Sequence, residues 1–128
     1  MVPARLNVIT LGTRDLPRQR SFYAALGWEV AIEAEHFCAF ELRGALVALF
    51  PWNKLAGDAQ AAAAPPTPGM RGFSLGINVD RPEQVDEIIA TVERAGATVT
   101  KPPSDPTELE GRHAYFADPE ETTRRSCA

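Results

Sequence analysis

The sequence predicts an α+β fold made of two tandem βαβββ modules, whose curved mixed sheets enclose a cleft. The motif Asp-x-Pro-x-Gln occurs twice, at residues 15–19 and 80–84. Each copy follows a Leu-Gly pair and precedes a helix-like stretch that ends at a Gly-x-x-Val motif. Because a duplicated unit offers a ligand site where its copies face each other, we expect the binding site at the junction of the modules.

Length and composition are typical of one globular domain: 128 residues, 45% of them hydrophobic and 23% charged. The net charge of −4 argues against a nucleic-acid-binding surface. No apolar run approaches the roughly 20 residues of a membrane span, and residues 1–11 lack the layout of a signal peptide. The two cysteines, Cys38 and Cys127, suggest no disulfide framework. We therefore expect a cytoplasmic protein that binds neither nucleic acid nor a membrane.

The first module is predicted over residues 5–52. It opens with a strand at residues 6–13, whose two faces differ in character. A helix follows, because Asp15 offers an N-cap oxygen and Pro17 fits the first turn. Its apolar stripe consists of Leu16, Phe22, Tyr23 and Leu26, and the helix stops at Gly27. Three strands complete the module, at 28–34, 37–42 and 45–50, the last two joined by an Arg-Gly turn.

Residues 53–70 are predicted to form an Ala- and Pro-rich linker without regular structure, stiffened by its prolines. The second module, residues 71–119, begins with an alternating strand at 71–79 and a helix that Asp80 caps and Pro82 starts. Two further strands are predicted at 98–101 and 113–116. The atypical tail, residues 120–128, lacks the alternation of a closing strand. We therefore expect the second sheet to be one strand short or to have a distorted, unpaired edge.

Two segments of the sequence resemble the vicinal oxygen chelate superfamily. They are Leu11–Trp28, which reads L-G-T-R-D-L-P…F-Y…L-G-W, and Phe116–Glu120, which reads F-A-D-P-E. This superfamily includes glyoxalase I, bleomycin-resistance proteins and extradiol dioxygenases. The resemblance covers about residues 5–120 and implies the glyoxalase/bleomycin resistance/dihydroxybiphenyl dioxygenase fold. It says little about the reaction, because the fold hosts lyases, epimerases, dioxygenases and binding proteins.

The resemblance also implies where a metal would bind, because family enzymes hold a divalent ion with one ligand from each of four strands. Three of these positions fall on Val8, Ala48 and Ser74. The fourth belongs to a strand after Asp118-Pro119-Glu120, where residues 121–128 offer no match. Divalent metals at such sites need imidazole or carboxylate donors. We therefore expect no metal cofactor there, with a divalent metal at a displaced site as the alternative.

The alternation of the strands predicts which side chains line the cleft. Ile9, Leu11, Phe73, Leu75 and Ile77 are expected to pack against the helices. The predicted ligand-binding residues are Val8, Thr10, Phe40, Ala48, Phe50, Trp52, Ser74, Asn78, His113 and Tyr115. Such a lining of apolar and neutral hydrogen-bonding groups is typical of a site for a small organic molecule. Of the two histidines, His113 is the better candidate for a functional contact, since His36 lies at a predicted turn.

Two main functional hypotheses follow from the resemblance. In the first, the protein binds or sequesters a small organic molecule without a metal and forms a homodimer. In the second, it is a lyase, isomerase or dioxygenase that uses a metal at a displaced site near His113, Glu41 or Asn78. A third hypothesis is a degenerate copy that is kept for an interaction with a partner. The sequence assigns no catalytic residue.

Overall fold

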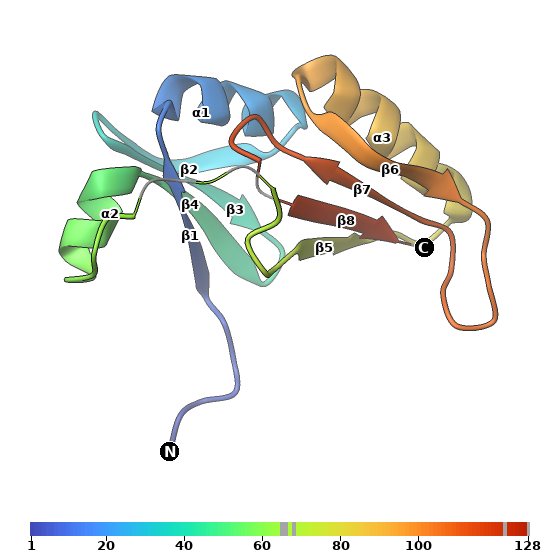
Figure 1. The fold of residues 1–128 in the computed structure, drawn as a ribbon, viewed down its shortest axis with the longest axis horizontal. Coiled ribbons are helices and arrows are strands. Elements are labelled where there is room, and N and C mark those ends of the chain that lie inside the picture. The colour runs from blue at the N-terminus through green and yellow to red at the C-terminus, as the bar shows by residue number, and fades with distance from the viewer. Residues whose placement is uncertain (65–66, 68, 122, 128) are drawn as a thin grey trace. The chain divides into compact units, whose positions relative to one another are not determined.

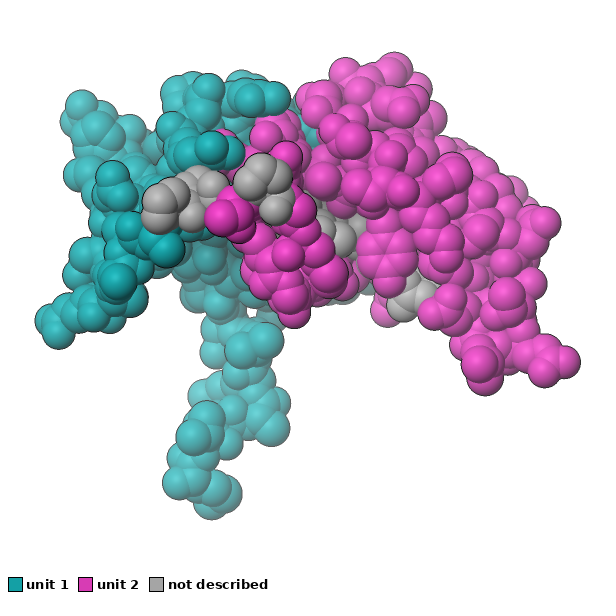
Figure 2. Space-filling model, viewed as in Figure 1, with its two compact units in different colours: residues 1–66 teal, residues 67–128 magenta. Residues whose placement is uncertain are grey.

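The computed structural model describes residues 1–64, 67, 69–121 and 123–127 (Figure 1). The chain divides into two compact units, Met1–Pro66 and Thr67–Ala128, coloured separately in Figure 2. Each unit contains one four-stranded sheet. Two of the three strand pairs in each sheet are antiparallel and one is parallel. The predicted α+β class with two βαβββ modules is therefore confirmed.

The first unit follows the predicted order of elements and adds one helix, α2, at its end. Its elements are β1 (Val8–Thr13), α1 (Leu16–Ala25), β2 (Glu29–Ala34), β3 (Phe37–Leu42), β4 (Ala45–Pro51) and α2 (Trp52–Asp58). The strands are ordered β1-β4-β3-β2 across the sheet, and the parallel pair is β1 with β4. The two-residue turn predicted between β3 and β4 is present, and Gly44 supplies its positive φ of 91°.

Helix α1 begins and packs as its sequence predicts. The Asp15 carboxylate caps it by accepting a hydrogen bond of 3.1 Å from the backbone N–H of Arg18. The rings of Phe22 and Tyr23 are buried on the inner side of the helix. Tyr23 stacks on Trp28 at a centroid distance of 5.1 Å, so this aromatic cluster joins α1 to the start of β2.

Helix α2 occupies part of the segment predicted as an irregular linker. It begins directly after β4 and packs against β1 and β4. A Cβ atom built on Gly12 would lie 3.1 Å from Trp52 Cε3, which shows how closely the helix approaches β1. This contact between distant segments stabilises the helix, because its seven residues are too few to be stable alone, although Trp52, Leu55 and Ala56 have helical spacing. The four alanines at 61–64 are not helical, and the linker residues 65, 66 and 68 lie outside the described residues.

The second unit repeats the arrangement. Its elements are β5 (Leu75–Asn78), α3 (Pro82–Ala95), β6 (Thr98–Ser104), β7 (His113–Ala117) and β8 (Thr123–Cys127). The strands are ordered β5-β8-β7-β6, and the parallel pair is β5 with β8. Helix α3 starts at Pro82 as predicted, but its N-cap is Arg81 and not Asp80. The backbone N–H of Arg81 donates a 2.9 Å hydrogen bond to Gln84 Oε1. Gly96 ends the helix in the left-handed conformation.

Strand β8 corrects the prediction for residues 120–128. The second sheet is not one strand short, because Thr123–Cys127 lies between β5 and β7 and pairs with both. A strand with neighbours on both sides satisfies its backbone hydrogen bonds whatever its side-chain pattern. The strand therefore forms here although its sequence does not alternate. Residues 122 and 128 of this tail lie outside the described residues.

Strand β5 is shorter than predicted. It starts at Leu75 and not at residue 71, and within the predicted range Gly72 holds a positive φ of 84° that interrupts an extended backbone. Phe73 therefore lies outside the strand and is 45% exposed, which contradicts its predicted packing against the helices.

The described helices include none that is both long enough and apolar enough to cross a membrane.

Candidate functional site

The face of the second sheet that points away from α3, here called its open face, carries the strongest candidate site. Successive side chains of a strand point to opposite faces. Ala114 and Phe116 of β7 are fully buried on the side of α3. The side chains of His113, Tyr115 and Ala117 alternate with them and therefore lie on the open face.

A cavity of about 540 Å³ lies on this open face. Its volume falls within the range of small-molecule pockets, roughly 300–1,000 Å³. The lining is predominantly apolar and consists of Gly69, Met70, Thr98, Thr100, Tyr115, Ala117 and Glu121. Its polar groups are three hydroxyls and the carboxylate of Glu121, a residue with a φ of 67°. A non-glycine residue in this conformation is strained, and such strain is common at binding sites.

His113 lies beside the cavity residue Tyr115, with their ring centroids 6.2 Å apart. Its imidazole is buried, with 4% of the side chain exposed. Nδ1 lies 3.0 Å from the carbonyl oxygen of Gly111. Because a carbonyl oxygen only accepts, Nδ1 carries the hydrogen, and the neutral ring has its lone pair on Nε2.

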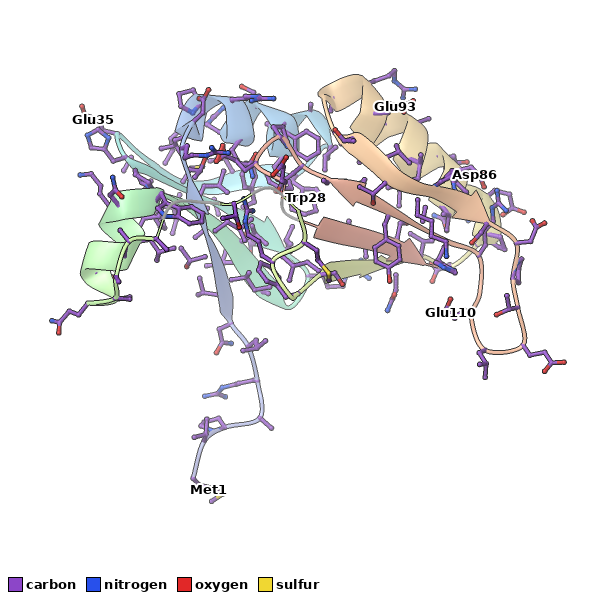
Figure 3. All side chains as sticks on the ribbon, in the orientation of Figure 1. Met1, Trp28, Glu35, Asp86, Glu93 and Glu110 are labelled. Atoms are coloured by element: carbon purple, nitrogen blue, oxygen red, sulfur yellow. The ribbon has the colours of Figure 1, made fainter. Side chains whose placement is uncertain are left out.

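Two charged groups approach Nε2 of His113. The ammonium of Lys101 lies 2.8 Å away, and Oε2 of Glu110 lies 3.2 Å away. Lys101 comes from β6, and Glu110 comes from the loop before β7, where Figure 3 labels it. The histidine therefore faces a cation and an anion on the same ring nitrogen.

An irregularity in β6 brings Lys101 to this face. Thr98 pairs with Ala117 and Val99 with Phe116, but Lys101 pairs with Tyr115. One extra residue, Thr100, is thus inserted in β6, and this shifts Lys101 from the helix side to the open face. A second irregularity separates Lys101 from Ser104. Bulges of this kind commonly redirect a side chain toward a functional site.

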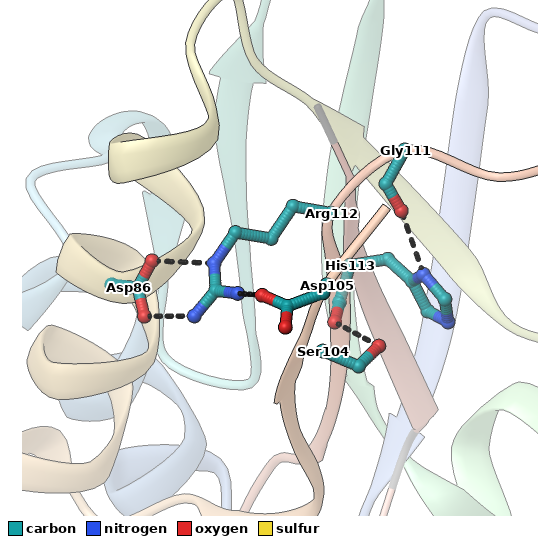
Figure 4. A network of polar contacts seen from close by, with 6 residues as sticks. All are labelled: Asp86, Ser104, Asp105, Gly111, Arg112 and His113. Atoms are coloured by element: carbon teal, nitrogen blue, oxygen red, sulfur yellow. Dashed lines mark hydrogen bonds and ion pairs between the residues drawn. The ribbon is translucent and has the colours of Figure 1, made fainter. Parts of the chain in front are cut away.

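Arg112 anchors the loop that carries Glu110 (Figure 4). It donates two hydrogen bonds to the carboxylate of Asp86 on α3, at 2.8 and 2.7 Å, and one of 3.1 Å to Asp105. These hydrogen bonds hold the pKa of Asp86 below its usual value and raise the pKa of Arg112. The arginine precedes His113 directly, so the network fixes the start of β7 relative to α3.

Comparison with known proteins identifies the family. The family model described as Glyoxalase/Bleomycin resistance protein/Dioxygenase superfamily matches residues 5–123. The chain belongs to this superfamily. The resemblance found in the sequence is therefore confirmed. A search of the curated proteins found no match.

Solved structures of superfamily members have the same fold. A glyoxalase/bleomycin resistance protein/dioxygenase family enzyme from Burkholderia phytofirmans PsJN is 26% identical, with a TM-score of 0.83 over 96% of this chain and 97% of its own. A glyoxalase-related enzyme from Fulvimarina pelagi is 24% identical, with a TM-score of 0.86 over 97% and 87%. The fosfomycin resistance protein FosX from Listeria monocytogenes, solved with Mn(II) and sulfate, is 18% identical, with a TM-score of 0.74 over 100% and 91%.

Six of the predicted site residues belong to the first unit, and five of them lie on or beside one face of its sheet. Val8, Thr10, Ala48 and Phe50 share one face of its sheet, as the register shows. Val8 is 52% exposed on this face, whereas Ala48 is buried. Trp52 lies on α2, close to Gly12 at the end of the same face, and its Nε1 donates a 2.8 Å hydrogen bond to the Ala64 carbonyl.

The prediction for Phe40 is corrected by the structure. Its ring is fully buried and lies 6.0 Å from that of Tyr23 on α1. Phe40 pairs with Val47, on the opposite face to Ala48. Its aromatic character signalled burial, and the strand register assigns that burial to the core beneath α1 and not to a ligand site.

In the second unit the structure brings His113 and Tyr115 together and places Asn78 in the same row of the sheet. Asn78 pairs with Cys127, which pairs in turn with His113. Ser74 is exposed and precedes β5.

The sequence prediction missed Lys101, Glu110 and the lining residues Thr98, Thr100 and Glu121. One available signal was the pair of prolines after Lys101, which interrupts a regular ladder of hydrogen bonds.

The superfamily's metal position does not fit the residues of this chain. Val8 and Ala48 carry hydrocarbon side chains, and Ser74 offers only an exposed hydroxyl. The fourth position lies in 121–128, where the side chains of 122–125, 127 and 128 are outside the described residues. Among the side chains that are described, no group of three or more His, Cys, Asp or Glu could hold a metal ion. The donor set expected for a divalent ion is therefore missing from these three positions.

Proposed function

We propose that this protein binds a small organic molecule without the help of a metal ion, and that the cavity beside Tyr115 receives it. The observation that carries the proposal is the lining of this 540 Å³ cavity, which combines apolar surface with three hydroxyls and one carboxylate. Apolar walls with a few convergent polar groups are typical of sites for small organic ligands.

The lining also favours a particular shape of ligand. Tyr115 offers an aromatic surface, and Met70 and Ala117 offer aliphatic ones, which together suit an apolar body. The hydroxyls of Thr98 and Thr100 can donate or accept, whereas the carboxylate of Glu121 only accepts. A ligand that complements this site has an apolar or aromatic body and at least one hydrogen-bond donor.

A compound screen by thermal shift tests the binding. A compound at a hundred times its Kd stabilises the folded protein by about 2.7 kcal/mol and raises its melting temperature. The variant Thr98→Trp fills the cavity and is expected to lose this shift. Glu93→Trp, at an exposed position of α3 labelled in Figure 3, is the matched control and keeps it. Hits that bind wild type and Thr98→Trp equally well would contradict the proposed location.

The metal-free part of the proposal needs its own measurement. Protein purified without chelators and dialysed against metal-free buffer is expected to hold less than stoichiometric zinc, iron, manganese or nickel by elemental analysis. The reason is the lack of imidazole and carboxylate donors at Val8, Ala48 and Ser74. One metal ion retained per chain would contradict it and would favour the alternative of a metal-dependent lyase, isomerase or dioxygenase.

Two further expectations from the sequence stay predictions. The first is a homodimer, which light scattering would detect as a mass of twice 13.9 kDa, and a mass of 13.9 kDa would contradict it. The second is a cytoplasmic location, which fractionation of the native cells would test.

A further inference from the structure

We infer that Lys101 is a reactive amine that condenses with an aldehyde or ketone carbonyl of the ligand, and that His113 is its base. This inference deepens the proposed function and rests on it, since the cavity beside Tyr115 must hold the rest of the ligand. It identifies the ligand class as carbonyl compounds with an apolar or aromatic body.

The two partners of His113 Nε2 match the two protonation states that the reaction requires. With the neutral ring, Nε2 accepts a hydrogen bond from the Lys101 ammonium at 2.8 Å. After the proton moves to Nε2, the ring becomes a cation, and its new N–H can donate to Glu110 Oε2 at 3.2 Å. Gly111 holds Nδ1 in both states. A nucleophile, a base and a group that orients the base are the recurring parts of such sites.

The position of Lys101 supports the same role. The inserted residue Thr100 places Lys101 opposite Tyr115, and both Thr100 and Tyr115 line the cavity. The Lys101 side chain is exposed, so a ligand can reach it, whereas the His113 ring is buried. A buried base beside an accessible amine protects the proton transfer from water while it leaves the nucleophile free to react.

The condensation balances without an oxidant or a metal. Lys101 gives one proton to His113 Nε2, and the amine lone pair attacks the carbonyl carbon. A C–N bond forms as the carbonyl π electrons move to oxygen. One of the two protons on the new ammonium nitrogen then moves to this oxygen through water, which gives a neutral carbinolamine. Loss of water yields the imine, so the net change is amine plus carbonyl to imine plus water.

Reductive trapping tests the inference with an internal control. Lys54 and Lys101 are the two lysines of the sequence, and Lys54 is exposed on α2. The full chain is incubated with benzaldehyde and cyanoborohydride, and labelling of each lysine is followed by peptide mapping. Because a positioned base contributes on the order of a hundredfold or more, we expect Lys101 to be labelled at least about tenfold faster than Lys54. Equal rates would overturn the inference.

Variants locate the source of the reactivity. Lys54→Arg is expected to keep the fast labelling, and Lys101→Arg to lose it. His113→Gln should lower the rate at Lys101 to about that of Lys54. Because His113 is buried and this variant can misfold, Glu110→Gln is measured as well, at a half-exposed position. We expect a fall of several fold there, and an unchanged rate in a folded Glu110→Gln variant would overturn the role of the carboxylate.

A second aldehyde separates this inference from the proposed function. Propanal is small enough to react without the cavity, whereas benzaldehyde should use it. If Thr98→Trp slows benzaldehyde but not propanal at Lys101, both proposals are supported. If Thr98→Trp slows neither aldehyde while Lys101 stays fast, the cavity proposal fails and the assigned apolar or aromatic ligand body fails with it. Only the reactivity of the Lys101 amine then stands. If wild-type Lys101 is labelled slowly by both aldehydes, the inference that Lys101 is a reactive amine fails. The thermal-shift screen then still tests whether the cavity binds a ligand.

Discussion

Ser126 places a hydroxyl oxygen inside the second unit, and among the described residues this oxygen has no hydrogen-bond partner. A buried polar group without a partner costs roughly 1–3 kcal/mol. We therefore expect Ser126→Ala to raise the free energy of unfolding by about 1 kcal/mol in urea titrations. Ser104→Ala is the control, because its hydroxyl donates to the His113 carbonyl at 3.4 Å. A loss of stability in Ser126→Ala would show that the hydroxyl is satisfied in solution.

Cys38 is the second residue whose surroundings give a direct expectation. Its side chain is buried on β3, and burial raises the pKa of its thiol. A raised pKa leaves less thiolate at neutral pH, and the thiolate is the reactive form. We expect iodoacetamide to modify Cys38 only after denaturant is added, as followed by peptide mass mapping that separates it from Cys127. Rapid modification of Cys38 in the native protein would contradict this expectation.

Among the elements, α2 depends on a glycine in the strand beneath it. A Cβ at Gly12 would lie 3.1 Å from Trp52 and 3.4 Å from Leu55. Gly12→Val is therefore expected to push α2 from the sheet and to cost about 1–3 kcal/mol, measured by thermal denaturation. Gly76, in the corresponding Leu-Gly pair, has no atom within 4 Å of such a Cβ. Gly76→Val should be neutral, and equal losses in both variants would contradict the role assigned to α2.

The attachment of the β6–β7 loop to α3 depends on pH. Because hydrogen bonds from Arg112 lower the pKa of Asp86, the ionised carboxylate stabilises the folded state above the ordinary value of about 3.9. This contribution is lost as the pH falls through the lowered pKa. We expect Asp86→Asn to melt below wild type at pH 7, and the difference to shrink as the pH falls below about 4.

Salt is the control for this pair, since both groups are near the surface and screening weakens such contacts. Half-molar salt should reduce the difference between Asp86→Asn and wild type at pH 7. A difference that is constant through the acid range would show that the aspartate acts through packing and not through its charge.

At the scale of the whole molecule, β8 decides whether the second unit folds. Within the described strands β5 pairs only with β8, so a chain that stops after Glu121 separates β5 from β7. We expect this truncation to unfold the second unit and to leave the first, which has its own sheet and core. Hydrogen exchange resolved by residue would show protection at Leu49 but not at Phe116. Removal of residues 1–5, which are exposed and outside any strand, is the control and should leave both units protected.

Much of the fold could be predicted because the signals are local. The Asp-x-Pro-x-Gln motif marks the start of both long helices, and glycines mark their ends. Helix α2 and strand β8 were not predicted, because the apolar spacing of α2 extends over only seven residues and β8 has no alternating pattern. The first forms against Gly12, and the second forms between two existing strands. Tertiary contacts of this kind override local propensity.

The candidate site was predictable only where alternation is regular. His113 and Tyr115 lie on the open face of β7, as their spacing predicts. Lys101 was missed because the inserted Thr100 reverses the face of the residue that follows it in β6, and a second irregularity before Ser104 reverses the pattern again. Phe40 was misassigned because an aromatic residue suits both a core and a ligand site, and only the register of β3 distinguishes them.

Each sheet joins its first strand to its last, β1 to β4 and β5 to β8. A contact between such distant segments forms only at the entropic cost of closing a long loop. This cost slows folding. The three antiparallel strands of each sheet can assemble from neighbouring segments, but the leading strand docks only when the trailing strand is in place. Refolding of each half should thus show its slowest step at β1 or β5, and these strands should be the first to detach under mechanical load or mild denaturant.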